Sequence, residues 1–155
     1  MKSAEARSEA TKSRVGGKTL LNQRIFLFGM VDKKTAENIL KIYEDAWVNQ
    51  DPEKILSIFT EDSVYHEKVL QKPYVGHEQI KQYWQSKVVE EQSDIKFKLL
   101  NYYIEEDIII AEWDASFFSN EKNGRVHIIE VAIMEISENK IKSLREYWQS
   151  EVLPP

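Results

Sequence analysis

Apolar and polar residues alternate along most of the chain after Ser93, and this alternation limits the fold more than any other feature of the sequence. A period of two is typical of strands with one buried face. It predicts strands over residues 95–99 and 109–117, and turn signals indicate two further strands over 125–136, which is apolar on both faces, and 141–150. The pair Asn123-Gly124 is a strong hairpin signal between the second and third of them. Consecutive strands joined by short turns are expected to form an antiparallel sheet.

The period is helical before that point. Apolar residues from Ala36 to Trp47 recur at spacings of three and four, which predicts a first helix with one buried face. Asp51 can cap a short second helix that begins at Pro52 and includes Phe59. A first strand from 64 to about 69 and a third helix over 80–88 follow. Three helices followed by consecutive strands define an α+β domain.

The 155 residues are enough for one domain, which we place at 32–155. Cysteine is absent, which excludes disulfides, thiolate metal sites and cysteine nucleophiles. Most of the 26 acidic residues lie in this domain, so it is a poor candidate for binding nucleic acid. No apolar run approaches the length of a membrane span, and a cytoplasmic location is expected.

Residues 1–31 form a predicted N-terminal extension. It is basic at first and becomes apolar at Leu20-Leu21 and over 25–28. We interpret it as a tail whose apolar end docks on the domain, or alternatively as a targeting segment.

The segment from Tyr43 to Trp84 resembles the opening half of the nuclear transport factor 2-like superfamily, the fold shared by SnoaL-like polyketide cyclases and ketosteroid isomerases. The resemblance rests on Tyr43-Glu-Asp-Ala-Trp47, the Pro73-Tyr-Val-Gly76 loop and the aromatic pair Tyr83-Trp84. The closing run 141–148 resembles the ending of many SnoaL-like domains. The resemblance implies a cone-shaped half-barrel, in which three N-terminal helices pack in a curved antiparallel sheet that encloses a pocket.

The same resemblance suggests catalytic residues. The helix-one tyrosine of the ketosteroid isomerases, which polarises the substrate, falls on Tyr43, and their general-base aspartate falls on Glu67. Their acidic oxyanion donor falls on Ala132, which departs from the pattern, but Glu130 lies two residues earlier on the same strand face. Because its neighbours on that strand are apolar, Glu130 is expected to be desolvated, which suits a proton donor or a ligand anchor.

Aromatic residues are numerous enough to wall a cavity for a flat apolar molecule. The predicted ligand-contacting residues are Trp47, Phe59, Tyr65, Tyr83, Trp84, Trp113, Ala132, Met134 and Trp148.

Each candidate also has a plainer interpretation. Glu67 could point to solvent or pair with Lys68 or Lys72, and Glu130 could pair with Arg145 across the sheet. Each aromatic residue could belong to the core. The three histidines show no metal-ligand spacing, so each is interpreted as a surface or core residue.

The sequence therefore predicts a SnoaL-like domain that binds a small apolar molecule and catalyses proton transfer on it, as an isomerase, dehydratase or cyclase without a cofactor or metal. The alternative is a non-catalytic ligand-binding or dimerisation module. A homodimer is expected through the apolar strip Ile129, Val131 and Ile133, and neither nucleic acid nor membrane is expected as a partner.

Overall fold

The computed structural model describes residues 29–154, of which 31–154 form one compact unit. The predicted extension 1–31 lies, up to residue 28, outside the described residues. Within the described part, no helix is long and apolar enough to cross a membrane.

Three helices precede most of the sheet. Helix α2 (Lys33–Val48) is capped by the Asp32 side chain, which accepts a hydrogen bond from the Thr35 N–H. Helix α3 (Pro52–Leu56) has Pro52 at its first position and Asp51 as its cap. Helix α4 (Gly76–Trp84) continues into one π-helical turn, η1 (Gln85–Val89). All three predicted helices are therefore present.

The strands form one six-stranded sheet in the order β2-β1-β6-β5-β4-β3. Their bounds are β1 Phe59–His66, β2 Tyr74–Val75, β3 Gln92–Glu105, β4 Ile108–Ser119, β5 Gly124–Ser137 and β6 Lys140–Val152. Neighbouring strands are antiparallel except β1 and β6, which run parallel. The sequence predicted Phe59 at the end of a helix, but the residue begins β1, because α3 ends at Leu56 and the chain turns at once into the sheet.

Tight turns with left-handed residues join the long strands. Glu138 and Asn139 both have positive φ, 53° and 62°, and connect β5 to β6. Two positive φ values are characteristic of the hairpin turn whose twist matches that of the flanking strands. Asn123, at φ 46°, precedes Gly124 where β5 begins, as the sequence predicted.

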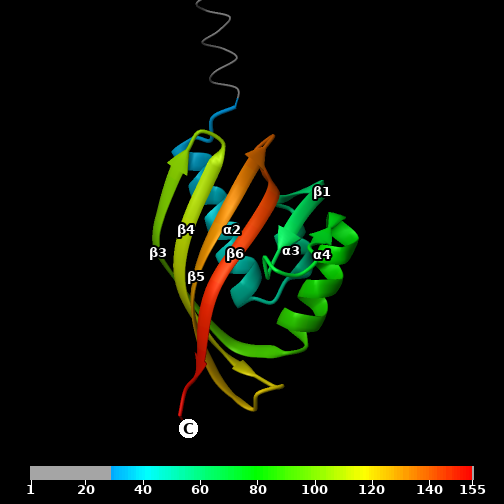
Figure 1. The fold of residues 1–155 in the computed structure, drawn as a ribbon, viewed down its shortest axis with the longest axis vertical. Helices are drawn as coiled ribbons and strands as arrows, with labels where there is room; N and C mark the ends of the chain where they lie inside the picture. Colours follow the sequence, from blue (N-terminus) through cyan, green and yellow to red (C-terminus); the bar gives the residue numbers. More distant parts are fainter. Residues whose placement is uncertain (1–28, 155) are drawn as a thin grey trace, which may run out of the picture. The chain divides into compact units, whose positions relative to one another are not determined.

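The long strands curve around helix α2, which lies against the inner face of the sheet, while α3 and α4 lie beside β1 (Figure 1). Along β4 and β5 alternate side chains are buried, among them Ile109, Ala111, Trp113, Ala132 and Met134. The predicted α+β cone is therefore confirmed, with helices packed against a curved sheet that does not close.

Candidate functional site

A cavity of about 310 Å³ lies between the concave face of the sheet and the helices. This volume falls at the lower end of the range of about 300–1,000 Å³ found for small-molecule sites. Its aromatic lining consists of Tyr43, Trp47, Tyr65, Tyr74, Tyr83, Trp84, Phe117 and Trp148. Several carboxyl groups also line it, so the cavity combines apolar walls with a few ionisable groups.

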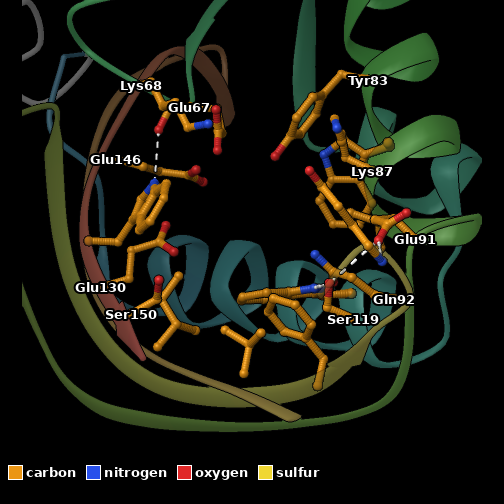
Figure 2. A pocket seen from close by; sticks show the side chains of 18 of the residues that line it. Glu67, Lys68, Tyr83, Lys87, Glu91, Gln92, Ser119, Glu130, Glu146 and Ser150 are labelled. Carbon is orange, nitrogen blue, oxygen red and sulfur yellow. Dashed lines mark hydrogen bonds between the residues drawn. The ribbon is translucent and has the colours of Figure 1, made fainter. Parts of the chain in front are cut away.

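The innermost of these carboxyl groups form a pair, Glu130 on β5 and Glu146 on β6. Only 4% of Glu130 and 5% of Glu146 is exposed to solvent. Glu146 on β6 lies directly opposite Ala132 on β5. Glu130 is two residues from Ala132 and is therefore on the same face of β5, so the side chains of Glu130 and Glu146 point to the same side of the sheet. Figure 2 shows both on one wall of the cavity, with Glu67 on the same side.

Two tyrosines bind Glu146. The Tyr43 hydroxyl donates to Glu146 Oε1 at 2.6 Å, and the Tyr65 hydroxyl donates to Oε2 at 2.8 Å. Burial raises the pKa of Glu146 to about 7, although both of these hydrogen bonds act in the opposite direction by stabilising the carboxylate. Tyr43 therefore directs its proton to a carboxyl group of the protein, whereas the resemblance assigned that proton to a substrate.

Glu130 differs from Glu146 in its hydrogen bonding. Its Oε1 atom is buried without a hydrogen-bond partner. Burial, and then the nearby charge of Glu146, raise the pKa of Glu130 well above its usual value. Two like charges this close cannot both be ionised without cost, so the pair retains a proton at pH values where an ordinary glutamate is ionised.

Glu67 lies at the end of β1, nearer the opening. It is half-buried and lines the cavity, and its backbone carbonyl accepts a hydrogen bond from Trp148 Nε1 at 3.1 Å. Burial raises the pKa of its carboxyl group, while the charges of Lys68 and Lys87 oppose that shift. Across the cavity lie Tyr83 and Lys87 (Figure 2).

The predicted site residues divide into two groups. Eight of them line the cavity: Tyr43, Trp47, Tyr65, Glu67, Tyr83, Trp84, Glu130 and Trp148. The other four, Phe59, Trp113, Ala132 and Met134, are at most 1% exposed and belong to the core instead. Trp113 is separated from the cavity by Tyr43, whose ring centroid lies 4.9 Å from that of Trp113.

The pairing of Glu130 with Arg145 that the sequence allowed does not occur. Arg145 binds Glu135 at 2.8 Å on the other face of the sheet. The sequence did not indicate Glu146 as a site residue. The spacing of two residues from Glu146 to Leu144 and to Trp148 could have placed it on their face of the strand. Counting in twos from Ile141 puts Glu146 on the opposite face, because the alternation is interrupted at Lys142.

The histidines do not form a site. His77 Nε2 lies 3.0 Å from the Phe59 carbonyl, and His127 lies between Asp114 and Glu151 on the outer face of the sheet. Among residues 29–154, no three His, Asp or Glu side chains are grouped closely enough to hold a metal ion.

Comparisons with known proteins agree with the fold. The model of the SnoaL-like domain family matches residues 39–144. No curated protein sequence matches the chain.

Solved structures share the fold at low sequence identity. SalBIII, described as an epoxide hydrolase/cyclase-like enzyme in pyran ring formation in the polyether salinomycin, is 20% identical, with a TM-score of 0.68 over 79% of this chain and 98% of its own. A putative SnoaL-like polyketide cyclase from Shewanella denitrificans is 13% identical, with a TM-score of 0.64 over 74% and 90%.

A third structure is a protein with a ketosteroid isomerase-like fold from Catenulispora acidiphila, solved with trimethylamine. It is 16% identical, with a TM-score of 0.63 over 70% of this chain and 83% of its own. The family match covers more than half of the sequence, and the chain belongs to the SnoaL-like domain family.

Proposed function

We propose that this domain is a cofactor-independent enzyme that binds a small, mostly apolar molecule in its cavity and moves a proton on it, as an isomerase, dehydratase or cyclase. The observation that carries the proposal is the buried pair Glu130 and Glu146, positioned with Glu67 on one wall of an aromatic cavity. Carboxyl groups in different environments have different pKa values, which allows one to accept a proton while another donates one.

Glu67 is the proposed base. It is the most accessible of the three carboxyl groups, and the neighbouring Lys68 and Lys87 favour its ionised form, which a base requires. Partial burial raises its pKa and so strengthens it as a proton acceptor.

Glu130 is the proposed acid or ligand anchor. Its partner Glu146 is held as a carboxylate by Tyr43 and Tyr65, so the proton of the pair resides preferentially on Glu130. Glu130 lines the cavity, so its carboxyl group lies next to a bound molecule.

The comparisons support this class of chemistry without assigning a reaction. A ring-forming enzyme and a putative polyketide cyclase share the fold, and both descriptions are compatible with acid and base groups that act on an organic substrate. At these identities the likeness shows the fold alone, so the proposal rests on the carboxyl groups of this chain.

A generic carbon acid tests the proposed base without knowledge of the substrate. Nitrobenzisoxazole loses its ring C–H proton to a base as its N–O bond breaks, and the product is a coloured nitrile phenolate. The Glu67→Gln substitution should lower turnover by roughly a hundredfold, because general-base catalysis typically contributes at least that much. Probe binding, followed by tryptophan fluorescence, should be retained.

The matched control is Glu61→Gln, which removes the same charge from an exposed position on β1 outside the cavity lining. Its turnover should equal that of the unmodified protein. If Glu67→Gln and Glu61→Gln behave alike, or if the unmodified protein is no faster than acetate, the alternative of a non-catalytic binding module replaces the enzyme proposal.

A further inference from the structure

The Glu130 carboxyl group lies on the inner wall of the cavity, on the same side as that of Glu146. Glu130 lines the cavity, and only 4% of the residue is exposed. A buried carboxyl group without a nearby positive charge is costly to ionise, so a ligand that brings a positive charge to this wall recovers part of that cost. The acidic pair therefore indicates where the polar end of a ligand binds.

The two most deeply buried charged groups of the cavity are both acidic. Its inner wall carries the acidic pair Glu130 and Glu146, both almost completely buried. The basic side chains that line the cavity in the described part of the chain are Lys68, Lys87 and Lys122, and all three are exposed. No cation of residues 29–154 forms an ion pair with Glu130 or Glu146. The inner wall is thus complementary to a positive charge.

Aromatic rings surround the same region. Tyr83 contacts both Tyr65 and Tyr74, with ring centroids 5.4 Å and 4.6 Å apart, and Tyr43 contacts Trp84 at 6.0 Å. All five residues line the cavity. The faces of such rings attract organic cations, and this attraction reaches about 2 kcal/mol where water is excluded. Carboxyl groups and aromatic rings together select an alkylated ammonium group over an uncharged one.

We propose that the ligand of this cavity is an organic cation, a protonated tertiary amine with an apolar body, whose N–H donates to the carboxyl group of Glu130. The charge of the amine is balanced by the pair Glu130 and Glu146, and its alkyl groups lie against the tyrosine rings. This inference rests on the proposed function for the cavity itself and names the substrate class.

Amine binding must then displace a proton. The groups that face Glu130 are Glu146 on β6, Trp113 on β4, Tyr43 on α2 and Tyr65 and Glu67 from β1 and its end, and none of them is a cation. Without ligand the acidic pair retains a proton near neutral pH, because burial raises the pKa of both groups and the charge of Glu146 raises that of Glu130 further. A bound ammonium group favours the ionised pair, so the retained proton is released to the solvent.

Three probes of the same shape separate charge from apolar contact. N,N-Dimethylbenzylamine is a tertiary amine that is protonated at neutral pH. Isobutylbenzene is its uncharged hydrocarbon counterpart, and benzyl methyl ketone offers a hydrogen-bond acceptor in the same position. Titration followed by tryptophan fluorescence and calorimetry should give at least tenfold tighter binding for the amine than for either neutral probe. Calorimetry in two buffers of different ionisation enthalpy should show proton release on amine binding alone.

Glu130→Gln keeps the shape of the side chain and removes its charge. It should weaken amine binding by tenfold or more and leave isobutylbenzene binding unchanged, which shows that the cavity is intact. The control Glu61→Gln should leave the binding of all three probes unchanged. Proton release by the unmodified protein tests the inference without any variant.

Tighter binding of the ketone than of the amine would overturn the inference, because it would identify protonated Glu130 as a hydrogen-bond donor to neutral carbonyl groups. Equal binding of the three probes would also overturn it. Neither result bears on nitrobenzisoxazole turnover by Glu67, so the amine inference and the proposed enzymatic function fail separately.

Discussion

Glu130 and Glu146 are buried on the same face of adjacent strands, and only Glu146 has hydrogen-bond partners, the hydroxyl groups of Tyr43 and Tyr65. This asymmetry makes Glu146 the first of the pair to ionise and Glu130 the group that retains its proton. Several consequences for stability, titration and assembly can be measured without a substrate.

The acidic pair should make the protein less stable as the pH rises from about 4.5 to about 7. In the unfolded chain Glu146 loses its proton near pH 4.5, whereas in the folded protein the same carboxyl group keeps its proton until about pH 7. The folded state therefore binds more protons in this window, and the free energy of unfolding falls as pH increases. The decline attributable to this group is roughly 3 kcal/mol. Urea denaturation across this window measures it.

The double variant Glu130→Gln/Glu146→Gln is the comparison, because its amides do not titrate. The free energy of unfolding of the double variant should not show this decline with pH. If both proteins show the same pH dependence, the pair does not hold a proton in the folded state.

Removal of either tyrosine hydroxyl should destabilise the folded protein. Tyr43→Phe and Tyr65→Phe each delete a hydrogen bond to buried Glu146, and hydrogen bonds to charged groups contribute about 1.5–3 kcal/mol. The loss should be larger above pH 7, where Glu146 is ionised, than at pH 5. Tyr147→Phe, on a residue that is 47% exposed, should change the free energy of unfolding by less than about 0.5 kcal/mol.

His127 should titrate above its usual value of 6.5. Its Nδ1 lies 3.2 Å from Glu151 and its Nε2 lies 3.1 Å from Asp114, and the contact with Glu151 followed by that with Asp114 raises its pKa. The protonated form of His127 stabilises the folded protein, and this stabilisation is fully present below pH 6.5 and is lost as the pH rises through the pKa of His127 in the folded state. NMR titration should show that Glu151→Gln lowers this pKa, whereas Glu138→Gln, in an exposed turn, leaves it unchanged. Equal pKa values in the two variants would contradict the assigned contacts.

The outer face of the sheet should form a homodimer contact. Ile129 is 36% exposed, Val131 and Ile133 are half-buried, and Tyr147 lies directly opposite Val131, so the apolar strip is available to a second copy. Sedimentation at tens of micromolar should show a dimer, and Ile129→Glu should dissociate it. Leu70→Glu, which places the same charge on a loop residue that is 99% exposed, should not. A monomer in the unmodified protein would refute the contact.

The sequence by itself determined the succession of β3 to β6 as antiparallel strands, but not the parallel pairing of β1 with β6. The sequence alternates regularly along β4, and this alternation correctly placed Trp113 on the inner side. Along β5, which is apolar on both faces, Glu130 was expected to be desolvated by its neighbours, and it is buried. Similarly, Asp32, Asp51 and Pro52 determine where the first two helices begin, because capping depends on a few neighbouring residues.

The tertiary structure decided which inward residues reach the cavity. Trp113 points inward like Glu130, yet the Tyr43 ring covers it, and spacing along a strand cannot reveal what packs over a side chain. Counting in twos along the sequence also gives the wrong inward face for the second part of β6. Lys142 has no partner on β5, so the face inverts after it, and Glu146 turns inward while Arg145 turns outward. A bulge adds one residue to one strand only, and its position depends on the pairing of both strands.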